Sequence, residues 1–168
     1  MATSNYNDAG LEIPELDEPR SYRIGFVVSE WNDGITQNLF QGAFDTLIDA
    51  GIIKENIVRW NVPGSFELVY GAKKMAESFD MLDAIVVIGV VIKGETRHFD
   101  FVCQGVTYGI QELNIKGDIP IVFCVLTDDN IDQSRARSGG EKGNKGIEAA
   151  MAALKMGKLK RDARFYKD

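Results

Sequence analysis

The sequence is poor in the residues that build metal sites and disulfide scaffolds, with two cysteines, Cys103 and Cys124, and one histidine, His98. The cysteines lie in apolar surroundings without metal-ligand spacing, so we expect buried free thiols. We predict no metal and no cofactor. Histidine is the side chain whose ordinary pKa, about 6.5, lies near neutrality, so His98 can both give and take a proton there.

Long apolar runs and an excess of positive charge are also absent. No apolar run has the roughly 20 residues that a membrane-spanning helix needs, and the N-terminal residues lack the pattern of a signal peptide. We therefore expect a cytoplasmic protein that binds no membrane. The net charge of −6 argues against nucleic-acid binding, which uses a basic surface. Residues 158–168 are a basic exception, expected to be a solvated helix end or tail.

The chain does contain a regular alternation of strand and helix patterns. Apolar, β-rich runs predict strands at YRIGFVVS, NIVRWNVPG, DAIVVIGVVI and IPIVFCVLT, and a helical spacing follows each. Such alternation implies parallel pairing through right-handed crossovers. We predict an α/β fold for residues 22–157, a three-layer αβα sandwich around a four-stranded parallel sheet. Residues 1–21 are acidic and are expected to form an extended or disordered arm.

The most distinctive polar residues follow these strands, in SEWND, PGSFE, IKGETRH and TDDN. In parallel sheets of this kind, ligands bind at the carboxyl ends of the strands. The positions of these four segments therefore predict a ligand site at one edge of the sheet.

The segment KGETRH follows the most apolar strand. A glycine before a helix start exposes backbone N–H groups that suit a phosphate, and Thr96 adds a hydroxyl. The alternative is that Thr96 caps the helix and His98 is an ordinary first-turn residue; these residues alone favour that alternative. Gly89 and Gly94 have the spacing of a nucleoside-triphosphate loop, but Glu95 stands where that motif needs lysine, which excludes it.

Other strand-end residues have open interpretations. Trp31 could stack on a flat heterocycle, worth roughly 1–3 kcal/mol, or could be partly buried against a neighbouring subunit. Glu67 could accept hydrogen bonds from ligand hydroxyls, or could place a charge near a helix N-terminus. Asp128, Asp129 and Asn130 look like helix N-caps, and their spacing is not that of a calcium loop.

The glycine-rich segment GGEKGNKG, residues 139–146, also allows two interpretations. It could fold over an anionic ligand, but by itself it is more typical of a flexible break between two helices. Arg135 and Arg137 precede it on a predicted helix. An arginine fork is a natural clamp for phosphate, although surface arginines are common.

The order and spacing of these motifs are more specific than any one of them. SEWND, VPGSFEL, GVVIKGETRHFDFV, VLTDDN and GNKGIEAA resemble, in that order, the motifs of the lumazine synthases of riboflavin biosynthesis, over about residues 22–157. The resemblance implies a flavodoxin-like sheet. It also implies condensation of 5-amino-6-(ribitylamino)uracil with 3,4-dihydroxy-2-butanone 4-phosphate, with release of phosphate. The expected assembly is a homopentamer, which in some members builds a hollow shell of sixty subunits.

The resemblance also implies roles for individual residues. His98 would shuttle protons. The residues expected to bind the pyrimidine and its ribityl chain are Trp31, Asn32, Ser65, Phe66, Glu67, Val91, Ile92, Phe123 and Lys145. The residues expected to bind phosphate are Gly94, Glu95, Thr96 and Arg137. Phe123 resembles an aromatic residue that reaches across from the adjacent subunit, so the site would be shared.

Two positions depart from the family pattern. Glu141 takes the usual lysine position and Lys142 falls one residue later, so both are left out of the site. Lys93 replaces a common arginine and loses its bidentate fork. The alternative to an enzyme is a non-catalytic flavin-binding or shell-forming scaffold of the same fold, which is disfavoured because the groups that the chemistry needs are present. A phospho-receiver domain would need an acidic pair after the first strand, where the chain has VVSEW.

Overall fold

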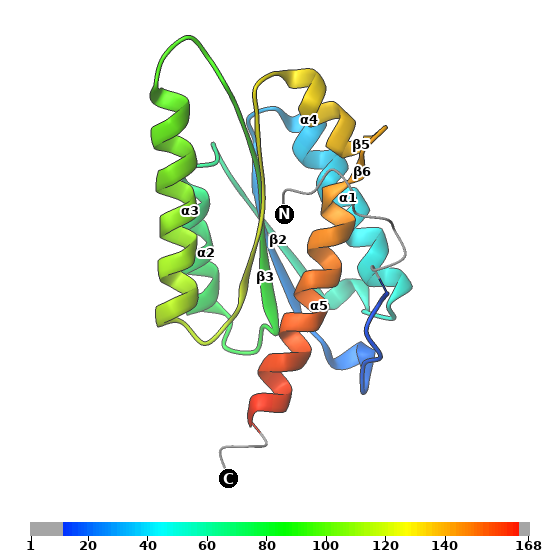
Figure 1. Ribbon diagram of the computed structural model, residues 1–168. Helices are drawn as coiled ribbons and strands as arrows, with labels where there is room; N and C mark the ends of the chain where they lie inside the picture. Colours follow the sequence, from blue (N-terminus) through cyan, green and yellow to red (C-terminus); the bar gives the residue numbers. More distant parts are fainter. Residues whose placement is uncertain (1–11, 165–168) are drawn as a thin grey trace.

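The computed structural model describes residues 12–164, built around one four-stranded parallel sheet (Figure 1). The strands are β1 Ile24–Ser29, β2 Ile57–Val62, β3 Ala84–Ile92 and β4 Ile121–Asp128. The α-helices are α1 Asp33–Asp49, α2 Leu68–Ser78, α3 His98–Lys116, α4 Ile131–Arg137 and α5 Lys145–Arg164. Short 3-10 helices, η2 Pro19–Ser21 and η3 Lys54–Asn56, precede β1 and β2. None of the helices within residues 12–164 is long and apolar enough to span a membrane.

Helices cover both faces of the sheet, which confirms the predicted three-layer sandwich (Figure 1). Alternate residues of a strand point to opposite faces, so β1 sends Phe26 into a core shared with α1 and α5, and Val27 into a second core shared with α2 and α3. β3 is buried from Ala84 to Val90, as expected for a strand that is covered on both faces.

The strand order β2-β1-β3-β4 is the flavodoxin-like order that the resemblance implied. All three strand pairs are parallel, with Ser29 opposite Val62 and Ile92 opposite Asp128. The carboxyl ends of the strands therefore lie along one edge. The chain order reverses between β1 and β3, and a crevice forms outside such a reversal.

The glycine-rich segment after α4 is ordered. β5, Ser138–Gly140, and β6, Gly143–Asn144, form a two-stranded antiparallel hairpin. The side chain of Asn144 ties this hairpin to two helices: Nδ2 donates to the carbonyl of Asn38 at 2.9 Å, and Oδ1 accepts the N–H of Gly146 at 2.8 Å. The prediction of a flexible break is therefore wrong, because contacts with a distant helix order the segment.

The two chain ends are described only in part. Residues 1–11 and 165–168 lie outside the described residues, so the predicted arm can be followed only from residue 12. Residues 12–18 form neither helix nor strand, and Leu16 packs against the core under α1 and α5. At the other end α5 continues to Arg164, so the boundary predicted at residue 157 falls inside a helix.

The two thiols are both free, as predicted, but they differ in burial. Cys124 on β4 is fully buried, and burial raises its pKa to about 12. Cys103 on α3 is only half-buried, so the prediction of burial is wrong for this residue. Helix α3 lies on the outside of the sandwich, and an apolar neighbourhood in sequence does not decide which face of a helix turns inward.

Candidate active site

Most of the predicted site residues follow the strands at the carboxyl edge of the sheet. They are residues 31–32 after β1, 65–67 after β2, and 94–96 and 98 after β3, and the polar segment 127–130 lies at the end of β4. Main-chain hydrogen bonds join them in pairs: Trp31 N–H donates to the Pro63 carbonyl at 3.1 Å, and Lys93 N–H to the Asp128 carbonyl at 2.9 Å. Sheet register thus brings together loops that are far apart in sequence.

Trp31 lies directly over the turn that follows β2. A Cβ atom added to Gly64 would be 2.6 Å from Trp31 Cε3, so the indole needs a glycine beneath it. Glu67 lies at the same place, where its Oε2 accepts the Gly64 N–H at 3.0 Å. Trp31 is nevertheless 66% exposed. The ring is therefore fixed from below and free to stack on a planar ligand. Gly64 is a supporting residue that the prediction omitted, although it lies in the segment PGSFE.

Ser65 and Phe66 use their side chains differently. The Ser65 hydroxyl is buried and donates to the Val90 carbonyl at 3.0 Å, so it joins the turn to β3. Phe66 is 59% exposed, and its ring lies against Gly105 of α3, where an added Cβ would be 2.9 Å from Phe66 Cε2. Only Phe66 therefore offers a large exposed side-chain surface at this turn.

The loop after β3 is open to solvent. Gly94, Glu95, Thr96 and His98 are all exposed, and a Cβ added to Gly94 would meet no atom within 4 Å. His98 is the first residue of α3, and its N–H donates to Thr96 Oγ1 at 3.3 Å. The N-cap residue of α3 is Arg97, with no side-chain cap bond, so Thr96 is not the cap that the alternative interpretation expected and its contact is a local turn. This contact engages the backbone of His98 and leaves the imidazole exposed.

Arg137 is held beside the end of β4. Its Nη1 donates to the Gln133 carbonyl at 3.0 Å, and its Nε lies 4.0 Å from Oδ1 of Asp128. Asp128 is only 7% exposed and accepts a hydrogen bond from the Ser134 hydroxyl at 2.6 Å. The cap of α4 is Asn130, whose Oδ1 accepts the Gln133 N–H at 3.0 Å. Of the three residues interpreted as caps, only Asn130 is one, because Asp128 accepts from Ser134 and Asp129 pairs with Lys93 at 3.4 Å.

Two predicted residues lie away from this edge within one chain. Phe123 is half-buried on β4, five residues before the strand ends at Asp128, which is about 16 Å at ~3.3 Å per residue. Lys145 begins α5, where its carbonyl accepts the thiol of Cys124 at 3.6 Å and its Nζ pairs with Glu148. One chain by itself does not bring these side chains to the exposed strand-end loops.

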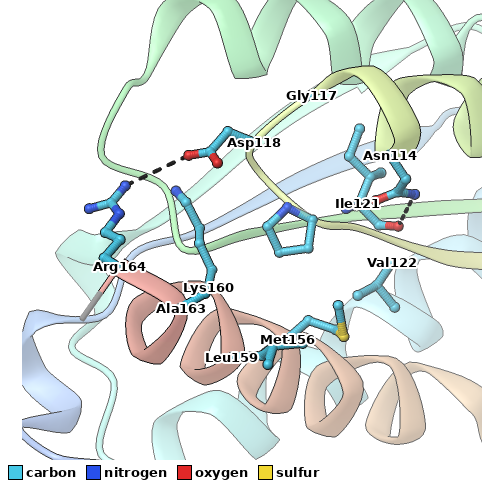
Figure 2. Close-up of a pocket in the computed structure, with 11 residues that line it drawn as sticks. Asn114, Gly117, Asp118, Ile121, Val122, Met156, Leu159, Lys160, Ala163 and Arg164 are labelled. Atoms are coloured by element: carbon cyan, nitrogen blue, oxygen red, sulfur yellow. Dashed lines mark hydrogen bonds and ion pairs between the residues drawn. The ribbon is translucent and has the colours of Figure 1, made fainter. Parts of the chain in front are cut away.

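Two of the grooves on the described surface differ in their relation to the site. One, of about 540 Å³, borders the site between α1, α4 and β5 and is lined by residues that include Asn32, Asn38 and Arg135. The other, of about 600 Å³, lies between β4 and the last turns of α5, where Met156 and Leu159 face Val122 (Figure 2). The second groove holds none of the predicted site residues. Neither groove contains both Trp31 and His98.

The described residues are suited to bind an organic ligand that carries an anionic group. Residues 12–164 contain no cluster of three or more histidine, cysteine, aspartate or glutamate side chains that could hold a metal ion. They do present a fixed aromatic ring, an exposed imidazole, a glycine-containing loop and a guanidinium at the ends of β1, β3 and β4. These groups can stack, transfer a proton and bind an anion.

Comparisons with known proteins agree with this chemistry. The model of the 6,7-dimethyl-8-ribityllumazine synthase family matches residues 21–161. Curated 6,7-dimethyl-8-ribityllumazine synthases are similar along nearly the whole chain. That of Christiangramia forsetii is 64% identical, with 99% of each chain covered, and that of Flavobacterium johnsoniae is 56% identical, with 97% of this chain and 85% of the relative covered. The one from Porphyromonas gingivalis is 45% identical, with 96% and 99% covered. The chain belongs to the 6,7-dimethyl-8-ribityllumazine synthase family.

Proposed function

We propose that the protein condenses 5-amino-6-(D-ribitylamino)uracil with 3,4-dihydroxy-2-butanone 4-phosphate to 6,7-dimethyl-8-ribityllumazine and releases phosphate. The steps are imine formation, phosphate elimination and ring closure, which need two held substrates and a group that moves protons. One observation carries the proposal: the fixed but exposed ring of Trp31 follows β1, and the exposed loop that ends in His98 follows β3, on the two sides of the point where the strand order reverses.

The pyrimidine lies on Trp31 in this proposal. Glu67, next to the indole, has a second carboxylate oxygen with which to accept a hydrogen bond from the ribityl chain, and Phe66 covers that chain. Asn32 has a left-handed backbone, with φ of 59°, and its side chain does not cap α1, so the amide is available to the ring's polar edge. Val91 and Ile92, half-buried at the end of β3, form the floor.

The phosphate binds to the loop after β3. Within residues 12–164, no atom beyond the chain neighbours of Gly94 lies within 4 Å of a Cβ added there, so a ligand can approach its backbone closely. The N–H groups of Gly94 and Glu95 and the hydroxyl of Thr96 serve as donors, and Arg137 supplies the counter-charge. His98, next to this loop, carries the protons.

We also propose a homopentamer in which a neighbouring subunit supplies Phe123. Helix α3 exposes Phe101, Tyr108 and Ile115, which are seven residues apart and so share one face, with exposed fractions of 65%, 66% and 76%. An apolar stripe of this kind is typical of a protein contact. Light scattering should give five times the 18.6-kDa chain mass, or sixty times for a closed shell. A monomer with full activity would contradict the shared site.

A cytoplasmic location and small-molecule partners complete the proposal. The free thiols Cys103 and Cys124 suit a reducing compartment. Cell fractionation, with the protein followed by antibody, tests the location. Recovery outside the cytoplasm would contradict it.

The decisive experiment is to incubate the protein with both substrates and to follow the absorbance of the lumazine product. We expect product to form faster than in a protein-free control. If it forms no faster, the enzyme proposal fails and the non-catalytic scaffold remains. Riboflavin titration monitored by flavin fluorescence then tests whether that scaffold binds a flavin.

A further inference from the structure

We propose that Asp128 weakens the hold of Arg137 on inorganic phosphate and so helps the product to leave. This inference rests on the proposed function, in which Arg137 binds the phosphate of the substrate. Phosphate is released in every turnover of that reaction. A site that held the free ion too tightly would be inhibited by its own product. A fixed negative charge beside the arginine would limit this product inhibition.

The guanidinium of Arg137 is shared between the fold and the solvent. Nη1 donates to the Gln133 carbonyl at 3.0 Å, and Nε faces Oδ1 of Asp128 at 4.0 Å. The side chain of Arg137 remains 37% exposed. An anion can therefore reach the guanidinium, and an anion bound there lies within the electrostatic field of the Asp128 carboxylate.

Asp128 cannot move away from an arriving anion. Its side chain is only 9% exposed and accepts the Ser134 hydroxyl at 2.6 Å, and Ser134 is itself fully buried. The backbone of Asp128 is fixed as well, because its carbonyl accepts the Lys93 N–H at 2.9 Å. A buried charge is screened by water less than an exposed one. The carboxylate therefore repels phosphate at short range.

The other acidic groups nearby are placed differently. Asp129 pairs with Lys93 at 3.4 Å, and both side chains are more than half exposed. Asp132 pairs with Arg135 at 3.0 Å, with 84% and 66% of the side chains exposed. These charges are screened by solvent and salt. Asp132 on α4 is thus a matched control for Asp128, since each carboxylate lies near an arginine of the same helix.

The test is the affinity for inorganic phosphate of the full-length, assembled protein, measured by calorimetry and as product inhibition. Asp128→Asn keeps the shape and an oxygen that can accept from Ser134, but removes the charge. We expect phosphate to bind about three- to thirty-fold more tightly, the order expected for one charge at a partly exposed site, with a smaller gain at high salt. Asp132→Asn should leave the affinity within about twofold of the original.

Two further variants separate this inference from the proposed function. Arg137→Ala should weaken phosphate binding, and adding Asp128→Asn to it should bring a smaller gain than Asp128→Asn brings alone, since residues in one network are coupled. Unchanged phosphate binding in Arg137→Ala would remove Arg137 from the anion site. It would overturn both the proposed role of Arg137 as a phosphate ligand and the inference about Asp128. Weaker binding in Arg137→Ala, together with unchanged or weaker binding in Asp128→Asn, would overturn the inference alone.

A purely structural role for Asp128 predicts damage, never tighter binding. If Asp128→Asn does not fold, Asp128→Ser is the second variant, because serine is smaller and neutral and keeps a polar hydroxyl group. The same gain in phosphate affinity is expected from it, and its absence in a folded Asp128→Ser protein would count against the inference.

Discussion

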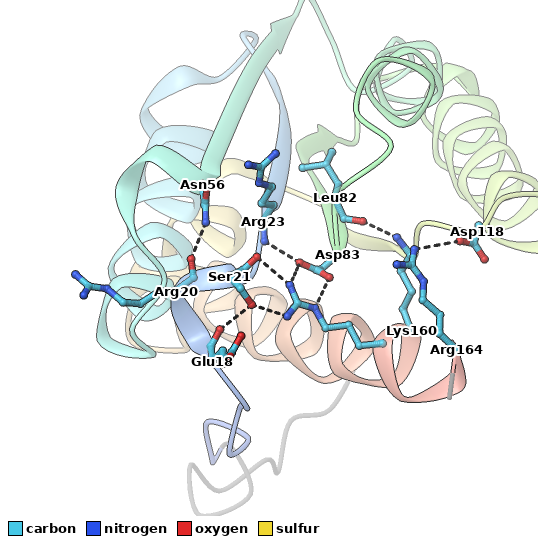
Figure 3. Close-up of polar contacts among 11 residues, drawn as sticks. Glu18, Arg20, Ser21, Arg23, Asn56, Leu82, Asp83, Asp118, Lys160 and Arg164 are labelled. Carbon is cyan, nitrogen blue, oxygen red and sulfur yellow. Dashed lines mark hydrogen bonds and ion pairs between the residues drawn. The ribbon is translucent and has the colours of Figure 1, made fainter. Parts of the chain in front are cut away.

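The two ends of the sheet use charged side chains in opposite ways. At the amino end, Arg161 of α5 donates to both oxygens of Asp83, at 2.6 and 2.8 Å, and lies 3.6 Å from the centre of the Tyr22 ring. Asp83 also accepts the Arg23 N–H at 2.8 Å (Figure 3). At the carboxyl end, by contrast, Glu95 and His98 are exposed.

This contrast separates stability from binding. The amino end joins α5 to the starts of β1 and β3, and it uses its charges on internal partners, including Lys160 Nζ on the Leu82 carbonyl at 2.7 Å (Figure 3). Donors that are engaged inside the fold are not available to a ligand. The carboxyl end keeps its imidazole, loop and indole open, so they add little to stability and are available to substrates.

The largest expected effect lies at the carboxyl end. His98→Ala should lower the rate by about 10²- to 10⁴-fold, the range of a general acid–base group, while the melting temperature stays the same because the imidazole is exposed. Steady-state kinetics and thermal unfolding measure the two quantities. The neighbouring Arg97→Ala, 84% exposed, is the control and should keep its activity. Full activity of His98→Ala would remove this residue from the mechanism.

The opposite pattern is expected at the amino end. Arg161→Ala leaves the buried carboxylate of Asp83 without its main counter-charge and should reduce the free energy of unfolding by about 2–4 kcal/mol. Activity below the unfolding temperature should persist. Arg164 follows Arg161 by about one turn of α5 and pairs with Asp118 at 3.9 Å, with both side chains largely exposed. Arg164→Ala should therefore change the free energy of unfolding in urea by less than about 1 kcal/mol. Equal losses of stability in the two variants would show that the network at Asp83 contributes no more than the exposed Arg164–Asp118 pair.

A smaller effect is expected at the indole. Trp31→Ala should weaken binding of the pyrimidine substrate by about 1–3 kcal/mol, the contribution of one stacked base. Trp31→Phe is the conservative control and should retain most of the affinity, since it keeps an aromatic face. Calorimetric titration of both variants measures this. Unchanged affinity in Trp31→Ala would favour the other interpretation, in which this ring contacts a neighbouring subunit.

The smallest effect concerns alkaline pH at the amino end. Burial raises the pKa of Tyr22 above its ordinary value of 10.0, against the opposing pull of Arg161. The unfolded chain therefore loses this proton first. The stability that the Tyr22 proton contributes to the folded state is present below pH 10, and it is lost as the pH rises through the pKa of Tyr22 in the folded protein.

Tyr22→Phe should accordingly lose less stability than the original protein as the pH rises above 10, as measured by urea midpoints. The raised pKa of Cys124 acts in the same direction in both proteins, so their difference isolates Tyr22. Parallel pH curves would contradict the prediction.

Local patterns were sufficient for the main elements of the fold. The apolar runs predicted all the strands of the main sheet, and β3 is buried from Ala84 to Val90 as its composition required. The β5–β6 hairpin was missed, because Asn144 finds its acceptor at Asn38, 106 residues earlier. A pattern of a few residues cannot contain such a contact.

For the site, the sequence by itself determined which chemical groups follow each strand: an indole after β1, a glutamate after β2 and a glycine-containing loop with a histidine after β3. It did so because strand periodicity and chain order are local properties. Tertiary structure alone decided that Gly64 supports Trp31, that Arg161 pairs with Asp83 across 78 residues, and that Phe123 lies far from the loops of its own chain. Those relations depend on the packing of distant segments, where distances of a few ångströms decide whether charges pair or remain free for a ligand.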